Sequence, residues 1–239
     1  CSSGTLRGSC RQRTPALSEP STPAKKRRHM RRLGIVFSLV TLVVSSTSWA
    51  FITPFGQRVD EVISRGLEHF RQTQNADGGW GGATGLVTLC FLEQRLSADW
   101  NAPSRGYVGM PPEDQERIRN SIRYCIDNVG GFGNGPANAY KAGACLMSLS
   151  LYIGTGGPND VGASRGVLEA IELGVDNIKN AQGNCGTNIG GWHYIDRDNG
   201  ECQGDLSTTQ FTMAGLSAAA AIFPTADATV NLVSTFLDN

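Results

Sequence analysis

Four carboxylates lie within ten residues of one another late in the chain, where paired acids could do chemistry. They are Asp196, Asp198, Glu201 and Asp205. Paired carboxylates can cleave glycosidic bonds, and clustered carboxylates can bind calcium. A calcium loop needs acids or amides at alternate positions before its glycine, but Gly200 comes one position too early for that pattern. The sequence therefore predicts a solvated turn here and no metal site.

Single residues next to this loop are the other candidates for a functional site. Asp205 opens a new helix, so it is a candidate catalytic acid, although an aspartate at this position is more often an N-cap that accepts backbone N–H bonds. His193 follows a tryptophan and is a candidate ligand-binding residue or base, with an ordinary polar loop residue as the favoured alternative. Trp80 and Trp192 are candidate binding residues, and packing within their turns is the favoured alternative.

These candidates belong to a pattern that occurs three times. Each copy reads as an amphipathic helix, a Gly-Gly-aromatic turn and a second, more apolar helix, which is typical of helical-hairpin repeats. The copies span residues 66–94, 121–156 and 174–223, with turn aromatics Trp80, Phe132 and Trp192.

The first copy sets the expectations for the helices. Residues 57–73 predict an amphipathic helix, because apolar residues recur every three or four positions from Val59 through Val62 and Ile63 to Leu67. Residues 84–94 are apolar nearly all round and predict a buried helix. Each pair should therefore have an outer amphipathic helix and an inner buried one.

The N-terminal 50 residues predict processing rather than a domain. Residues 1–29 are rich in Ser, Thr, Pro and Arg and should be disordered or translated from upstream sequence. Residues 30–50 read as a signal peptide, since a basic run precedes a largely apolar run of 12 residues (33–44) and a small-residue site ends at Ala50. That apolar run is shorter than the roughly 20 residues of a spanning helix. Export with cleavage after Ala50 is expected, leaving residues 51–239 as one repeat domain without a stable membrane span.

Removal of the signal changes the charge of the protein. Nine of the 21 Lys and Arg residues lie in residues 1–50, but only one of the 21 acids, Glu19. The remainder carries 12 basic and 20 acidic residues, a net charge of −8. An acidic exported domain is a poor partner for nucleic acid or an anionic membrane surface.

Five cysteines follow the signal segment, and export permits disulfides. Cys185 and Cys202 flank the third turn and its loop, so we predict a bridge between them. Cys90 and Cys145 lie on the expected inner helices and should be small buried apolar residues.

The segments QTQNADGGW (72–80), GNCGTNIGGW (183–192) and DLSTTQFTMAGLSAA (205–219) resemble the terpenoid cyclase and protein prenyltransferase superfamily. In particular they are similar to the Gln-Trp motifs of its prenyltransferase and squalene-cyclase repeats. The resemblance covers about residues 59–223. It implies an all-α fold, an α/α toroid whose outer helices ring inner helices around a cavity. About three and a half hairpins are present, because residues 227–237 begin a fourth outer helix, so the ring should be incomplete. Either the chain is a fragment, or a partner chain completes the ring.

The chain departs from the catalytic motifs of that superfamily. Squalene-type cyclases open an inner helix with Asp-x-Asp-Asp-Thr-Ala, whose central acid protonates the polyene. The matching slot here begins at Asp205, and the two further acids are replaced by Ser207 and Thr208. Hydroxyls are far too weakly acidic to protonate an alkene. The Asp-x-Cys zinc pair of the prenyltransferases also lacks its cysteine, so no cofactor is expected.

Three functional hypotheses follow. The first is an exported, non-catalytic repeat protein that binds an apolar ligand or a protein partner. The second is a fragment of a terpenoid cyclase or prenyltransferase-like enzyme, which export disfavours. The third is an α/α-barrel carbohydrate-active enzyme, and the loop carboxylates are the only residues that support it. We favour the first, and whether any catalysis occurs stays open.

Overall fold

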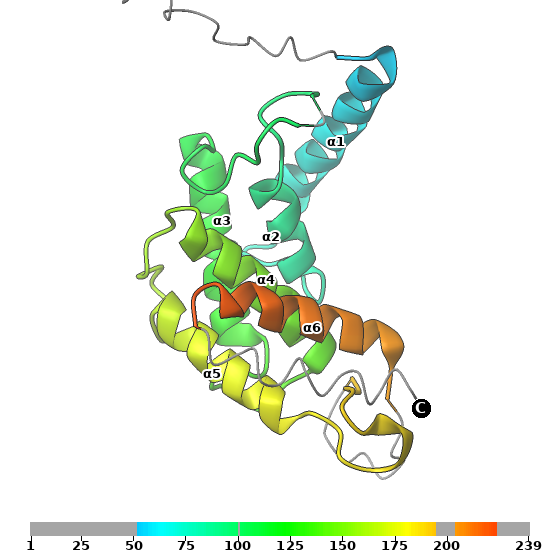
Figure 1. The fold of residues 1–239 in the computed structure, drawn as a ribbon. Coiled ribbons are helices and arrows are strands. Elements are labelled where there is room, and N and C mark those ends of the chain that lie inside the picture. Colours follow the sequence, from blue (N-terminus) through cyan, green and yellow to red (C-terminus); the bar gives the residue numbers. More distant parts are fainter. Residues whose placement is uncertain (1–51, 100, 195–203, 224–239) are drawn as a thin grey trace, which may run out of the picture. The chain divides into compact units, whose positions relative to one another are not determined.

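The computed structural model describes residues 52–99, 101–194 and 204–223, and these residues are helical with no strand among them. The all-α fold class is therefore confirmed (Figure 1). The predictions for residues 1–50 lie outside the described residues, as does the expected fourth outer helix. The helices, with one short 3-10 helix η1, are α1 (Pro54–Thr73), α2 (Thr84–Leu92), α3 (Pro112–Asn128), α4 (Ala139–Gly154), α5 (Val167–Asn180), η1 (Gly186–Asn188) and α6 (Leu206–Ala220).

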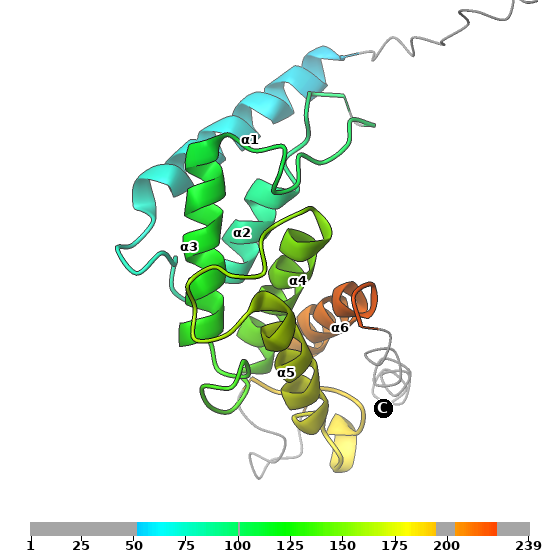
Figure 2. The same cartoon turned by 90° about the vertical axis from the view of Figure 1, so that its left-hand side faces the viewer.

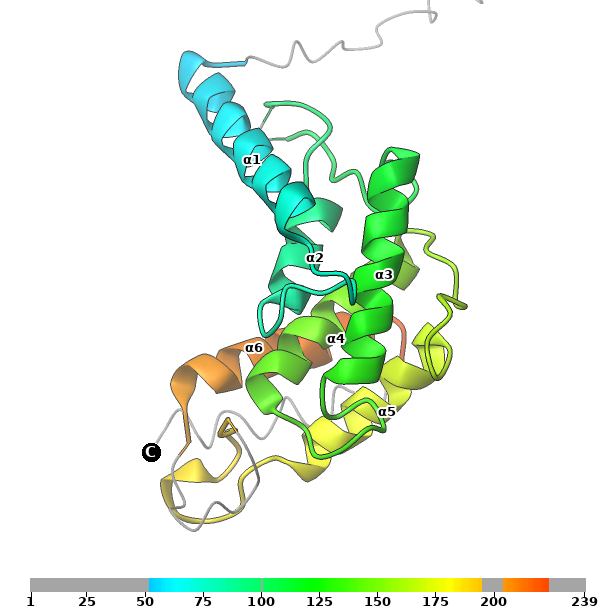
Figure 3. The same cartoon turned by 180° about the vertical axis from the view of Figure 1, so that it is seen from behind.

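The helices pack as two rows that alternate along the chain. α4 lies between α2 and α6, and these three form the inner row. α3 packs against α2, α4 and α5, while α5 packs against α4 and α6. Figures 2 and 3 show the outer helices α3 and α5 alongside this row from two further directions. The arrangement is a repeat of helical hairpins, as the sequence predicted.

Glycines hold the inner row together. A Cβ on Gly85 of α2 would lie 2.6 Å from backbone atoms of α4, and one on Gly143 of α4 would lie 2.7 Å from the backbone of Phe211 in α6. Across that second contact, a Cβ on Gly215 would lie 2.6 Å from the carbonyl oxygen of Gly143. No side chain fits at these distances, so the inner helices touch backbone to backbone.

The C-terminal half of α1 is anchored to α3 by an ion pair. The Arg71 guanidinium donates from Nε to Asp114 Oδ1 (3.0 Å) and from Nη2 to Asp114 Oδ2 (2.8 Å), which joins α1 to the first turn of α3. Asp114 is 2% exposed, so this two-pronged ion pair is largely shielded from water on its acidic side. Leu67 is the buried residue of α1.

The apolar stripe of the first helix extends beyond this anchor. Phe55 is 77% exposed, Val62 57% and Ile63 45%. The periodicity predicted a helix correctly, but its N-terminal half has no described helix to cover its apolar face. Amphipathicity therefore did not imply burial here.

The expectation that the second helix is buried all round was wrong. Leu86 and Leu89 of α2 are partly exposed, and Cys90 is exposed, which corrects its prediction as a buried residue. These three positions share the side of α2 away from its neighbours α1, α3 and α4. The helix is apolar on its free side as well as on its packed sides, which hydrophobicity alone cannot distinguish.

Candidate functional site

The first Gly-Gly-Trp turn is held by hydrogen bonds of its glutamine and its tryptophan. Gln74 Nε2 donates to the carbonyl oxygen of Gly78 at 2.7 Å, and the Trp80 indole Nε1 donates to the carbonyl oxygen of Phe70 at 3.1 Å. The Trp80 backbone N–H donates to the Thr84 hydroxyl at 2.8 Å, which ties the turn to the start of α2. The turn therefore links the end of an outer helix to the beginning of an inner one.

The third turn repeats these bonds with equivalent residues. Gln182 Nε2 donates to the carbonyl oxygen of Gly190 at 2.8 Å, and Trp192 Nε1 donates to the carbonyl oxygen of Ile178 at 2.8 Å. The Trp192 backbone N–H donates to the Thr209 hydroxyl at 3.0 Å. The Gln–Gly spacing grows from four to eight residues between the two turns, yet the bonding pattern is kept.

The second turn is held mainly by the packing of its aromatic ring. Phe132 is fully buried, and its ring lies where a Cβ on Gly174 of α5 would be only 2.6 Å away. Asn177 Nδ2 donates to the carbonyl oxygen of Gly131 at 2.7 Å, so α5 is bonded to this turn. Here too the turn aromatic is a structural residue.

The two candidate binding tryptophans do not present their rings as a surface for a ligand. Trp192 is 0% exposed, so its ring has no free surface. Trp80 is partly buried between Phe70 and Phe91, with ring centroids 6.3 and 6.1 Å away. This geometry supports the packing interpretation for both residues.

Asp205 caps α6. Its Oδ1 accepts from the Thr208 backbone N–H at 2.7 Å and from the Ser207 hydroxyl at 2.6 Å. Burial by itself would raise the pKa of Asp205, but these bonds and the nearby His193 outweigh it and hold the pKa below its ordinary value. The carboxylate is thus ionised and committed to the helix end, which does not suit a general acid.

Substitutions of Asp205 can separate its role as a helix cap from the effect of its charge. Asp205→Asn is expected to retain most of the stability, because asparagine caps as well as aspartate does, whereas Asp205→Ala should cost about 1 kcal/mol. Since the folded-state pKa is lowered, the charge-dependent part is present above the unfolded-state pKa and is lost as pH falls through the folded-state pKa. Urea denaturation at neutral and acidic pH measures both effects. An asparagine variant as unstable as the alanine variant at neutral pH would contradict the capping role.

A cluster of aromatic rings that the sequence did not predict lies beside this cap. Tyr194 is 40% exposed, and its ring stacks on Tyr140 of α4 at 5.6 Å. Tyr140 in turn meets Phe211 of α6 edge to face at 4.6 Å. The His193 ring is 5.8 Å from Tyr194, at right angles to it. No sequence signal could reveal the cluster, because its members come from different repeats.

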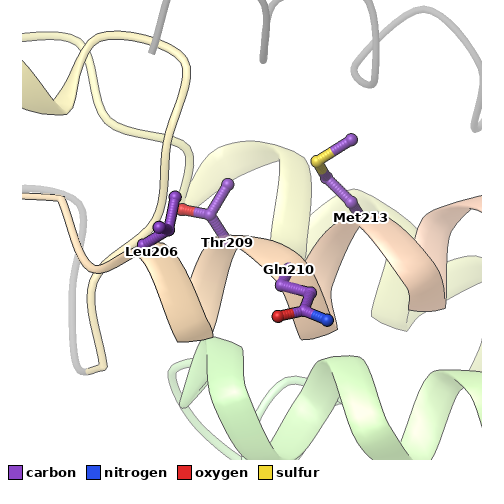
Figure 4. Close-up of a pocket in the computed structure, with 4 residues that line it drawn as sticks. All are labelled: Leu206, Thr209, Gln210 and Met213. Carbon is purple, nitrogen blue, oxygen red and sulfur yellow. The ribbon is translucent and has the colours of Figure 1, made fainter. Parts of the chain in front are cut away.

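The face of α6 that no described helix covers carries a hollow of about 320 Å³. It is lined by Leu206, Thr209, Gln210 and Met213, which lie along two consecutive turns of the helix (Figure 4). The lining carries no charged group among the described residues. A volume of this order is at the lower end for a small-molecule pocket.

The remaining predicted site residues lie elsewhere in the chain or outside the described residues. Cys185 is disulfide-bonded. Cys202 falls outside the described residues, so its pairing with Cys185 stays a prediction. Asp196, Asp198 and Glu201 fall in the same gap. Among the residues that the structure describes, no group of three metal-ligating side chains comes together, and no helix is long and apolar enough to span a bilayer.

The comparisons with known proteins add nothing to this geometry. No protein-family model matches the chain, and no curated protein or solved structure matches it.

Proposed function

We propose that this chain is an exported, non-catalytic repeat protein that binds an apolar ligand on the free face of its inner helices. The observation that carries the proposal is the apolar character of that face where no described helix covers it. On α2 it presents Leu86 and Leu89, and on α6 it presents Leu206 and Met213 beside the hollow. Leu206 is 64% exposed and the other three are partly exposed, and α2 and α6 lie on either side of α4. Apolar side chains are the usual lining of a ligand site.

The buried residues of the inner helices show on which side the apolar face lies. The opposite sides of α2, α4 and α6 pack on one another and on the outer helices, with Thr88, Leu146 and Leu216 all fully buried. The free stripes therefore lie away from the outer row. In an α/α toroid of the terpenoid cyclase and prenyltransferase type, which we propose as the complete architecture, this side would line the central cavity.

A binding role also fits the chemistry of the third turn. Asp205, the one acid kept from the cyclase motif, is engaged as a helix cap with a lowered pKa. Ser207 and Thr208 occupy the positions of the other acids. Export remains part of the proposal and rests on the basic and apolar runs before residue 50 and the small-residue site at Ala50.

A protein partner is the second candidate, and the outer helix α1 favours it. Phe55, Val59 and Val62 leave an exposed apolar stripe on the N-terminal half of this helix. Exposed apolar patches on helices often mark protein contacts. This candidate would gain if the chain failed to bind any apolar probe.

The ligand site can be tested with the neutral fluorescent probe N-phenyl-1-naphthylamine. Met213→Glu is expected to weaken probe binding by about tenfold or more, because an apolar ligand would then be placed against a charge. Leu168→Glu is the matched control, since Leu168 is also a partly exposed apolar residue (38%) but lies on the outer helix α5. Fluorescence titration measures both. Equal binding by the two variants, or no binding by the unmodified chain, would contradict the site.

A further inference from the structure

Three aromatic residues from two repeats meet next to the helix cap of α6. The Tyr194 ring stacks on Tyr140 of α4, with ring centroids 5.6 Å apart and an angle of 28° between the planes. Phe211 of α6 meets Tyr140 edge to face at 4.6 Å, and these three residues form the aromatic cluster. Tyr194 is 40% exposed, and Tyr140 and Phe211 are partly exposed. The cluster therefore presents ring surface that a ligand can reach.

Two hydrogen bonds join the aromatic cluster to a carboxylate. The Ser207 hydroxyl donates to Asp205 Oδ1 at 2.6 Å. Because that bond uses the only proton of the serine hydroxyl, Ser207 accepts from the Tyr194 hydroxyl, whose oxygen lies 3.3 Å from Ser207 Oγ. The exposed tyrosine is thus tethered to Asp205 through one serine, which holds its ring in place beside the carboxylate.

The carboxylate of Asp205 carries a full negative charge and has an oxygen to spare. Although burial acts in the opposite direction, the hydrogen bonds from Ser207 and Thr208 hold the pKa of Asp205 below its ordinary value, so the group is ionised at neutral pH. Both bonds end on Oδ1, which leaves Oδ2 unused by them. Asp205 is also partly exposed, so a solute can approach it.

Ring surfaces and an ionised carboxylate attract the same class of ligand. The face of an aromatic ring is negative, and it attracts a cation placed over it. Quaternary ammonium groups are bound in this way, because their alkyl groups pack on the rings while their charge interacts with the ring faces. The net charge of −8 on residues 51–239 adds a long-range attraction for cations. A neutral ligand would gain only the packing, and an anion would be repelled.

We propose that the aromatic cluster and Asp205 bind a small organic cation of the quaternary ammonium class, with its alkylated nitrogen against the exposed part of Tyr194 and beside the Asp205 carboxylate. This site combines residues of α4, α6 and the segment before α6. It is separate from the hollow that we propose for an apolar ligand, which α6 alone lines. The cation site does not depend on that ligand.

Choline and its neutral isostere 3,3-dimethylbutan-1-ol test the proposal, because they share a shape and differ in charge. Isothermal titration calorimetry of the full chain at constant ionic strength should show choline binding about tenfold or more tighter than the isostere. His193 also lies near Asp205, and a protonated imidazole would compete with choline, so the titrations are run at pH 8. Equal binding of the two compounds, or no binding of choline, would overturn the proposal. Tighter binding of methyl glucoside than of choline would make this a sugar site instead.

Variants of the site locate the bound cation. Tyr194→Ala should weaken choline binding about tenfold, whereas Tyr194→Phe keeps the ring and should retain most of it. Asp205→Asn keeps a capping side chain and removes the charge, so it should weaken choline binding without unfolding α6. Phe55→Ala removes another exposed ring, 77% exposed on α1, and should have no effect. Unchanged choline binding by Tyr194→Ala would refute the site.

The two proposed sites can fail independently. Met213→Glu, which is expected to weaken binding of neutral N-phenyl-1-naphthylamine, should not weaken binding of choline. Conversely, Tyr194→Ala should leave binding of the naphthylamine probe unchanged, because Tyr194 does not line the hollow. Loss of choline binding in Met213→Glu, in a variant that stays folded, would place the cation in the hollow and overturn the assignment to the aromatic cluster.

Discussion

Replacing Trp192 with alanine is expected to lower the free energy of unfolding by about 3–5 kcal/mol. The side chain is 0% exposed, so its removal leaves a cavity in the core of the third hairpin. It also removes the indole donor to the carbonyl oxygen of Ile178, which lies in the last turn of α5. That carbonyl oxygen keeps a bond from the Ala181 backbone N–H at 3.1 Å, so the lost indole bond adds a smaller cost to that of the cavity. Urea denaturation followed by circular dichroism measures the change.

Two further variants identify the source of the effect. Trp192→Phe keeps most of the ring and loses the N–H, so its cost should be well below that of alanine. Trp80→Ala removes the equivalent residue of the first turn, which is only partly buried and donates through a longer bond of 3.1 Å. Its cost should therefore be smaller than that of Trp192→Ala. An equal or larger loss at Trp80 would contradict the view that burial sets the importance of each turn.

The turns themselves were the part of the molecule most accessible from sequence. A glutamine, two glycines and a tryptophan specify a compact local turn, and the bonds from Gln74 to Gly78 and from Trp80 to Phe70 stay within ten residues of the chain. The further bonds of the Gln74 side chain to Arg117 of α3, 43 residues away, were not accessible in the same way. The role of Thr209 was not predicted, although Thr84 stands at the equivalent position four residues after Trp80. In the third repeat the loop between Trp192 and Thr209 is long enough to hide the correspondence.

Features that depend on distant partners were not accessible. The hydrophobic period of α1 correctly indicates a helix, but exposure of Phe55 and Val62 depends on which helices reach its N-terminal half. Cys90 and Cys145 both lie on apolar inner helices, yet one is exposed and the other buried, because only Cys145 lies on a packed side of its helix. The aromatic cluster around Tyr140 is likewise assembled by contacts between repeats.

The second large effect is expected where α4 meets α6. Gly143→Ala should lower the free energy of unfolding by about 3 kcal/mol, the upper part of the range for overpacking a close contact. The added Cβ would lie 2.7 Å from the backbone carbonyl of Phe211 and 2.8 Å from the backbone nitrogen of Thr212. Backbone atoms of a packed helix cannot turn aside as a flexible side chain can, so α6 must shift as a unit. Urea denaturation again gives the magnitude.

Gly66→Ala is the matched control for this substitution. Gly66 lies inside α1, and a Cβ there would meet nothing within 4 Å. Alanine should therefore stabilise the protein by about 0.5–1 kcal/mol, because glycine is the weaker helix former. If Gly143→Ala proved as harmless as Gly66→Ala, the backbone contact between α4 and α6 would not exist in solution.

The same pair of variants connects the packing to the proposed ligand site. Phe211 and Thr212, which a Cβ at position 143 would push against, lie between Gln210 and Met213 in the lining of the hollow. A shift of α6 moves that lining relative to α4, so Gly143→Ala should also weaken binding of N-phenyl-1-naphthylamine, measured where the variant is still folded. Gly66→Ala should leave binding unchanged. If Gly143→Ala lost stability but kept its binding, the probe would bind away from α6, and the exposed apolar residues of α2 would become the expected site.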